Sequence, residues 1–321
     1  MKNVITGSNG NRLQSEATQV AEKRLPEQER ILGIAYEEAF WRSLFRVRSA
    51  RKGLYEWSRY GKEIQLDNFD IITFLEEWES RHEARPVILD VGSGASFCTG
   101  NLLHGKEIDI HYIDPLAFYY NRIISKTRPQ HFPLVEFGTI EQLSAFYPHG
   151  NIAFIHVQNA LDHCQSPLRG IIECLRSLAI GGILYLKHFP NEAERENYRG
   201  FHQYNIEFTD HSLVIWNRQE RHDINTLLKS FTDISVSLSN IGEVIAVIRK
   251  TNGVPPTLYN DAQNLRELCE MQSQTVAAFS SFNFSMKYHI RRRFYIIVQN
   301  IMRRFSPQFK AKLKKYLFHK Q

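Results

Sequence analysis

The stretch VILDVGSGAS at residues 87–96 constrains the fold of this 321-residue chain more strongly than any other part of it. The aliphatic residues around Asp90 form the nearly continuous apolar run of a strand buried in a parallel sheet. Gly92 and Gly94 follow at once, and because they lack a Cβ they allow a sharp bend and a close approach to a ligand. If residues 99–105 continue as a helix, its first N–H groups face the same ligand. The stretch predicts a nucleotide-binding turn.

A second acidic residue is expected on the neighbouring strand. Residues 111–113 are followed by Asp114, twenty-two residues beyond Gly92. In an open α/β sheet, ligands bind at the carboxyl ends of the strands, and a carboxylate there can accept hydrogen bonds from both ribose hydroxyls. The dinucleotide fingerprint needs a third glycine where this chain has Phe97. A dinucleotide-dependent oxidoreductase is therefore the disfavoured alternative.

In this order, the motifs resemble those of the class I S-adenosylmethionine-dependent methyltransferases, and of type 11-like members in particular. The first motif of that family is acid-x-Gly-x-Gly-x-Gly, and this chain has Ser96 at the last position. Stretches 138–143 and 159–163 are similar to later motifs of the family, although Thr139 replaces an aspartate. The resemblance covers residues 85 to 250. It implies a Rossmann-like α/β fold with a mostly parallel seven-stranded sheet and an antiparallel last strand.

The same resemblance implies S-adenosyl-L-methionine as the cofactor. The glycine bend then forms the methionine side of the pocket, the second acid binds the ribose, and the stretch at 138–143 lies along the adenine. The cofactor-binding residues expected on this basis are Asp90, Gly92, Ser93, Gly94, Asp114, Pro115, Thr139, Ile140 and Asn159.

Methyl transfer from a sulfonium is an in-line displacement, so the protein must hold acceptor and methyl group in a reactive arrangement. An alcohol acceptor also benefits from a base. His163 is the expected base and Asp162 the carboxylate that orients it, although His163 could instead cap a helix or line the pocket. The polar stretch after the fifth expected strand suggests an acceptor such as a sugar. The expected substrate-binding residues are His188, Asn191, Asn197 and His202.

A metal site is not expected from the sequence. Asp162, His163, His188 and His202 could in principle assemble one. Their positions do not show the tight ligand spacing of a metal motif.

Alternating apolar and amphipathic segments favour a parallel sheet with crossover helices. Strands are expected near 87–91, 110–114, 133–137, 152–157, 183–188, 233–239 and 243–249. Helices are expected near 99–105, 116–126, 140–146, 167–178 and 261–279. Gly181 and Gly182 are interpreted as a helix stop, Asp67 as a helix cap, and 204–216 as a hairpin.

Four segments are expected along the chain. They are a disordered N-terminus (1–28), a helical cap (29–84), the cofactor-binding domain (85–250) and a basic helical extension (251–321). After Met271 the chain contains eleven Lys and Arg residues and no acidic residue. Because the net charge of the whole chain is +6, the formal charge of the preceding part is 6 − 11 = −5. Helices in 284–321 could lie on an anionic membrane surface, pack on the domain or on a partner subunit, or bind nucleic acid. Binding to nucleic acid would make RNA binding salt-sensitive and dependent on this segment.

Four cysteines without a C-x-x-C pair favour reduced thiols and a cytoplasmic location, and no stretch is apolar enough to span a membrane. The favoured function is O-methylation of a sugar, glycan-linked or lipid-linked small acceptor. A catalytically silent methyltransferase-like subunit and an RNA methyltransferase remain alternatives, with nucleic acid the less favoured partner.

Overall fold

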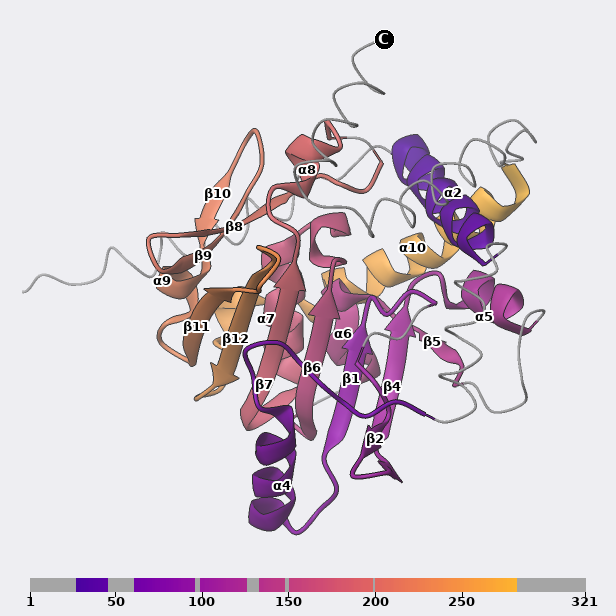
Figure 1. Ribbon diagram of the computed structural model, residues 1–321. Coiled ribbons are helices and arrows are strands. Elements are labelled where there is room, and N and C mark those ends of the chain that lie inside the picture. The colour runs from indigo at the N-terminus through magenta and orange to yellow at the C-terminus, as the bar shows by residue number, and fades with distance from the viewer. Residues whose placement is uncertain are drawn as a thin grey trace, which may run out of the picture.

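The computed structural model describes residues 27–45, 61–95, 99–125, 133–147, 150–198 and 200–281. At its centre lies a seven-stranded sheet in the order β11-β12-β7-β6-β1-β4-β5 (Figure 1). Strands β1, β4, β5, β6 and β7 are parallel, and β12 runs antiparallel to both of its neighbours. The bounds are Val87–Val91 (β1), Asp109–Asp114 (β4), Val135–Phe137 (β5), Ile152–Gln158 (β6), Leu178–His188 (β7), Thr232–Leu238 (β11) and Val244–Lys250 (β12). The predicted fold class is confirmed.

The adjacent central strands β1 and β6 are buried along almost their whole length. In β1, Ile88 and Leu89 are fully buried, and in β6 so are Phe154 and Ile155. Because alternate side chains point to opposite faces, each strand supplies apolar residues to two layers of core. This explains why these strands appear in the sequence as continuous apolar runs. Because β1 and β6 pair in parallel, their carboxyl ends lie side by side in the middle of the sheet.

One face of the sheet is covered by α7 (Pro167–Ser177), which packs with α6 (Leu143–Phe146) and the short helix η1 (Ile140–Gln142). Ser166 caps α7 by accepting the N–H of Arg169, and a proline follows in the first turn. The other face is covered by α4 (Ile71–His82), whose Phe74 packs against Phe154 of β6. Burial of these apolar faces fixes both helices on the sheet.

The cap of α4 differs from the prediction. Asp70, not Asp67, accepts the N–H of Thr73 through Oδ1, at 3.1 Å. Asp67 lies one turn too early and instead accepts the ammonium of Lys187 at 2.7 Å. Both aspartates precede the same apolar run, and only the fold decides which one reaches the helix.

The helix predicted at 99–105 is absent, and β2 (Leu102–Leu103) and β3 (Lys106–Glu107) form a small hairpin there. The turn residues His104 and Gly105 have φ values of 50° and 73°. Two consecutive residues in this region are typical of a tight hairpin turn and break a helix. The connection from β1 to β4 therefore contains no helix in the residues that the structure describes.

The predicted helix stop at Gly181 and Gly182 is also wrong. Helix α7 ends at Ser177, and both glycines lie inside β7. A Cβ on Gly182 would approach the backbone oxygens of Ala153 and Ile152 to 3.1 Å. The pairing of β6 with β7 shifts register between Ile152 and Phe154, so the glycine allows two strands to approach at an irregular point.

The polar stretch after β7 forms a separate layer at one end of the sheet. It contains α8 (Glu192–Arg195) and a three-stranded sheet of β8 (Asn205–Thr209), β9 (Ser212–Trp216) and β10 (Arg221–Asp223). The predicted hairpin is therefore confirmed, with Asp210 and His211 in its turn. Asp223 then caps α9 (Ile224–Leu228) by accepting the N–H of Thr226.

Two helices from opposite ends of the chain lie side by side above α5 (Ala117–Ser125) (Figure 1). They are α2 (Glu27–Leu44) and α10 (Asp261–Ser281). Arg30 of α2 donates to the sulfur of Met271 in α10 at 3.1 Å. On the α10 side, Arg169 of α7 binds both Glu267 and Asn264. The helical parts before and after the domain therefore pack on each other.

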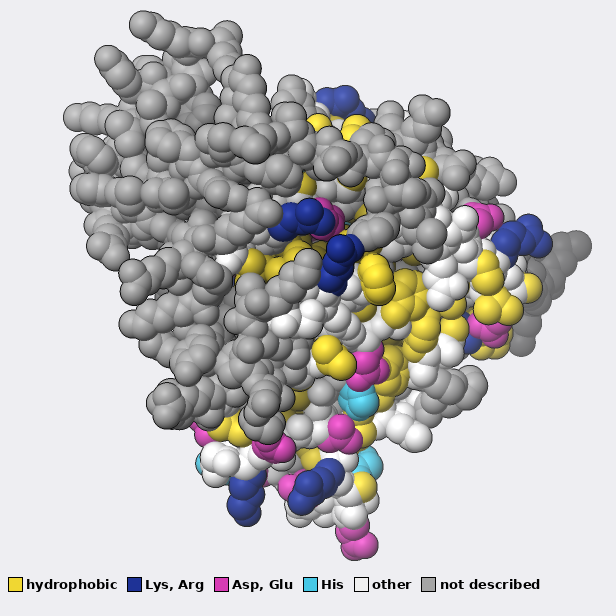
Figure 2. All heavy atoms as spheres, turned by 90° about the vertical axis from the view of Figure 1, so that its right-hand side faces the viewer, with side chains coloured by type: hydrophobic (Ala, Val, Ile, Leu, Met, Phe, Trp, Pro, Cys, Tyr) yellow, Lys and Arg dark blue, Asp and Glu magenta, His cyan; other side chains and the backbone are white. Residues whose placement is uncertain are grey.

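Figure 2 shows the side of the molecule that carries α5, β5 and α10, where hydrophobic side chains form a band between charged ones. Phe118, Leu134 and Leu265 from this region are 66%, 61% and 59% exposed. No row of Lys and Arg is visible among the described residues of this face. None of the described helices is both long and apolar enough to cross a membrane. The expectations for 1–26, Ser96, Phe97 and 284–321 lie outside the described residues.

Candidate functional site

The glycine bend is hydrogen-bonded to the end of the neighbouring strand. The N–H groups of Gly92 and Ser93 donate to the carbonyl of Ile113 in β4, at 2.8 and 3.2 Å. Gly92 and Gly94 have φ values of 69° and 59°, a region that favours glycine. A Cβ on Gly92 would lie 2.3 Å from the Cβ of Ala160. Both the bend and its tight packing against the segment after β6 therefore require glycine.

Asp114 points toward this bend, as the sequence predicts. Its Oδ2 accepts the N–H of Gly94 at 3.1 Å, and its Oδ1 accepts the N–H of Leu116 at 2.8 Å. A carboxylate offers about four lone-pair sites, so it can accept two more hydrogen bonds. Burial raises the pKa of Asp114 to about 7, although the two N–H groups act in the opposite direction. The site therefore holds a buried carboxylate with unused acceptor capacity.

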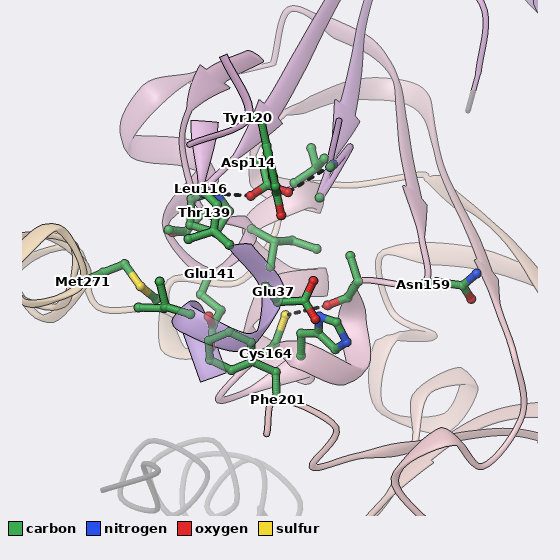
Figure 3. Close-up of a pocket in the computed structure, with 18 of the residues that line it drawn as sticks. Glu37, Asp114, Leu116, Tyr120, Thr139, Glu141, Asn159, Cys164, Phe201 and Met271 are labelled. Atoms are coloured by element: carbon green, nitrogen blue, oxygen red, sulfur yellow. Dashed lines mark hydrogen bonds between the residues drawn. The ribbon is translucent and has the colours of Figure 1, made fainter. Parts of the chain in front are cut away.

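A pocket of about 150 Å³ lies between the bend and the helices α2 and α10. Asp114 and Tyr120 lie at one end of it, and Cys164 and Phe201 at the other (Figure 3). Eight of the predicted site residues line its wall, namely Gly92, Gly94, Asp114, Pro115, Thr139, Ile140, Asn159 and His163. The wall also includes residues that are not among the predicted site residues, such as Ile34, Glu37, Trp41, Tyr120, Phe201 and Met271.

Trp41 of α2 stands directly against the bend. A Cβ on Gly94 would lie 2.5 Å from the edge of the Trp41 ring, which also packs on Tyr120. Ligand pockets usually enclose about 300–1,000 Å³, more than is open here. A nucleoside-sized ligand would therefore need additional space, and the Trp41 ring stands against Gly94 on the α2 side of the pocket. Its position gives this tryptophan a direct part in the site rather than in the core alone.

Asp90 and Ser93 are not on the pocket wall. Asp90 is 2% exposed, and its Oδ1 lies 2.8 Å from Nδ1 of His156. Its Oδ2 accepts the hydroxyl of Thr99 at 3.1 Å. Ser93 is buried within the bend and donates to the carbonyl of Gly94. Both residues hold the bend from behind, and neither faces the open space.

Asp162, His163 and His202 meet at the rim of the pocket. Nδ1 of His202 lies 2.7 Å from Oδ2 of Asp162 and 3.2 Å from Nε2 of His163. Nε2 of His163 lies 3.5 Å from the same Asp162 oxygen. Burial alone raises the pKa of Asp162, but the two histidines outweigh it and lower that pKa to about 2. Asp162 is therefore an anion held between two imidazoles.

The remaining predicted substrate-binding residues are placed differently from one another. His188 ends β7, is 2% exposed and has no hydrogen-bond partner for either ring nitrogen among the described residues. Burial lowers its pKa to about 4, so it is neutral near pH 7. Asn191 precedes α8 with a φ of 54°, and its Oδ1 is buried without a partner in the described part of the chain. Asn197 has an exposed side chain and a φ of 54°.

Comparison with known proteins gives structural neighbours only. No family model and no curated protein matches the sequence. A SAM dependent methyltransferase from Aquifex aeolicus shares 14% identity over 55% of this chain and 89% of that chain, with a TM-score of 0.34. The PH0226 protein from Pyrococcus horikoshii OT3 shares 14% over 56% and 89%, with a TM-score of 0.35. An rRNA methylase from Streptococcus thermophilus shares 11% over 52% and 87%, with a TM-score of 0.31.

At these identities and TM-scores, the neighbours do not by themselves assign a function. A mostly parallel seven-stranded sheet with an antiparallel last strand is what the methyltransferase resemblance implies, and both features are observed. The chain therefore has a Rossmann-like α/β fold with a mostly parallel seven-stranded sheet. The glycine bend and Asp114 lie at the carboxyl ends of β1 and β4, where ligands bind in open α/β sheets.

The raised pKa of Asp114 gives a pH-dependent stability in the ligand-free protein. Because the folded-state pKa of about 7 lies above the ordinary 3.8, the protonated carboxyl group of Asp114 makes its full contribution to the stability of the folded protein below about pH 4. This contribution is lost as the pH rises to about 7, where the buried group ionises. An Asp114→Asn variant lacks this titration. Between pH 5 and 8, the free energy of unfolding of the variant relative to wild type should rise by roughly 2–3 kcal/mol. Urea denaturation of both proteins at the two pH values measures this change.

Proposed function

We propose that this protein is an S-adenosylmethionine-dependent methyltransferase. The observation that carries the proposal is the Asp114 carboxylate, which contacts the N–H of Gly94 and faces the pocket at the end of β4. A buried carboxylate beside a glycine bend can accept both ribose hydroxyls of an adenosine in charge-assisted hydrogen bonds. The fold is compatible with this use of the site, although a fold alone does not fix a function.

The cofactor would lie along the wall from the bend to η1. Gly92 and Gly94 leave room for its methionine part, Asp114 and Pro115 border the ribose, and Thr139 and Ile140 the adenine. Asp90 and Ser93 would contribute by fixing the bend. Asn159 lies on the same wall, but its side-chain oxygen accepts the N–H of Phe189 at 3.0 Å, so we assign it a positioning role.

The acceptor would enter at the rim where Asp162, His163 and His202 meet. The cofactor would supply a methyl group whose bond to sulfur breaks, with the electron pair kept by sulfur, as a carbon–oxygen bond forms to the acceptor hydroxyl. The His163 imidazole would take the hydroxyl proton, and Asp162 would stabilise the resulting positive charge. His188, Asn191, Asn197 and His202 would supply hydrogen-bonding groups for a sugar, glycan-linked or lipid-linked acceptor.

We infer a cytoplasmic enzyme whose segment 284–321 contacts an anionic membrane surface. The support is the composition of that segment, in which Lys and Arg alternate with aromatic and aliphatic residues and acidic residues are absent. A lipid-linked acceptor would be consistent with such a contact.

Two measurements test this function. First, S-adenosylhomocysteine should raise the melting temperature of the purified chain, whereas NAD should not. Second, incubation with S-adenosylmethionine labelled in its methyl group and a fractionated cell extract should label glycan or lipid. Label in RNA would favour the RNA methyltransferase. Cofactor binding without any transfer would favour a silent subunit, and stabilisation by NAD alone would overturn the proposal.

A further inference from the structure

We propose that Asp162, His163 and His202 bind one divalent transition-metal ion at the rim of the pocket. Asp162 and His163 lie in η2 (Leu161–His163), directly after β6, and His202 lies between α8 and β8. His163 and His202 are 39 positions apart, so no short sequence motif joins them. The fold alone brings the three side chains together, which is why the sequence gives no metal-binding spacing.

The distances within the cluster match those between ligands of one ion. Oδ2 of Asp162, Nε2 of His163 and Nδ1 of His202 are separated by 2.7, 3.2 and 3.5 Å. Ligand atoms that lie about 2.0–2.1 Å from a tetrahedral zinc ion are about 3.3 Å from each other. The triangle therefore needs only small adjustments to place all three atoms around a common centre.

Hydrogen bonding alone satisfies this triangle poorly. If Nδ1 of His202 carries a proton, that single N–H faces two acceptors, Oδ2 of Asp162 and Nε2 of His163. If Nε2 of His163 and Nδ1 of His202 both carry protons, these two N–H groups face each other, with the nitrogens 3.2 Å apart. A cation at the centre accepts a lone pair from each of the three atoms, so it removes this competition.

A second observation points to a missing polar ligand. Oδ1 of Asp162 is buried and has no partner among the described residues, although the residue is only 3% exposed. Both ring nitrogens of His188, which interacts electrostatically with Asp162, also lack partners there. Buried polar atoms normally find a hydrogen bond. Water molecules held by an ion would supply donors and acceptors to these groups.

The ligand set indicates the kind of ion. Two imidazoles and one carboxylate suit zinc, manganese, iron, cobalt or nickel, whereas magnesium and calcium prefer sites made of oxygen atoms. Three protein ligands leave a further position open to a substrate. Resting on the proposed function, the ion would hold the acceptor hydroxyl beside the cofactor and lower its pKa. His163 would then act as a ligand rather than as the proton acceptor.

The test is a titration of the full chain, first stripped with a chelator, with zinc and with manganese salts. Calorimetry and elemental analysis should show one ion bound per chain. His202→Ala and His163→Ala should each weaken the affinity at least about 10-fold, since even the loss of a residue that only supports a ligand has that effect. The matched control is His104→Ala, because His104 is an exposed histidine that pairs with Glu76. This variant should bind the ion as wild type does.

S-adenosylhomocysteine binding is measured in parallel, because it reports the fold and the cofactor pocket independently of the ion. If the chain binds S-adenosylhomocysteine and neither metal, the metal site is refuted and the methyltransferase proposal stands. If the chain binds the ion but not S-adenosylhomocysteine, the methyltransferase proposal is refuted and the metal site stands. Equal metal affinity in wild type, His163→Ala and His202→Ala would place any bound ion elsewhere and refute the site.

Discussion

Replacing Asp114 with asparagine is expected to weaken the binding of S-adenosylhomocysteine by about 100-fold at pH 8. The carboxylate would accept two ribose hydroxyls, and hydrogen bonds to a charged group contribute about 1.5–3 kcal/mol each. An asparagine keeps the size of the side chain but has only one acceptor oxygen and no charge. A net loss of about 3 kcal/mol corresponds to that factor in the dissociation constant. Isothermal titration calorimetry measures it directly.

The control for this variant is Asp109→Asn. Asp109 is the first residue of β4 and Asp114 is the last. The Asp109 side chain is 53% exposed and lies at the end of the strand opposite to the pocket. This second variant makes the same chemical change without touching the pocket, so its affinity should equal that of wild type. An equal loss of affinity in both variants would mean that the ligand does not depend on the pocket carboxylate.

Replacing His163 with alanine should lower kcat by about 100- to 1,000-fold while changing the affinity for S-adenosylhomocysteine by less than about threefold. A positioned base typically contributes a factor of about 10²–10⁴, and an alanine can neither accept the proton nor hold an ion. His163 is one of many residues on the wall, so the cofactor keeps its main contacts. Single-turnover transfer to the acceptor identified by labelling separates the chemical step from binding.

The exposed His104 again provides the control, and His104→Ala should leave kcat unchanged. An unaltered kcat in His163→Ala would remove this residue from the reaction and favour an acceptor that arrives without a proton to lose. A parallel fall in kcat and in cofactor affinity would instead show that the substitution damages the pocket as a whole.

The sheet could be predicted from the sequence because its signals are local. Continuous apolar runs marked β1 and β6, and both strands form where they are expected. The errors occur where a residue's effect depends on distant contacts. Residues 99–105 contain leucines that suit a helix, but the left-handed His104 and Gly105 make a hairpin. The glycine pair in β7 ends no helix, and Gly182 instead allows close packing against β6.

The site could be predicted only in part for the same reason. Asp114 and the glycine bend belong to strand ends that are adjacent in any sheet of this order, so their meeting follows from topology. Trp41 comes from the segment predicted as a helical cap, whereas Met271 lies in the predicted C-terminal extension, and no local pattern in the sequence places that extension on the pocket. The contact of His202 with Asp162 likewise depends on how the stretch after β7 folds back.

A crystal structure of the chain with S-adenosylhomocysteine tests the central claim most directly. The expected result is a nucleoside in the pocket between the glycine bend and η1, with both ribose hydroxyls within about 3 Å of the Asp114 oxygens and the Trp41 ring displaced from Gly94. A ligand bound elsewhere, or a ribose that makes no contact with Asp114, would contradict the proposed cofactor site.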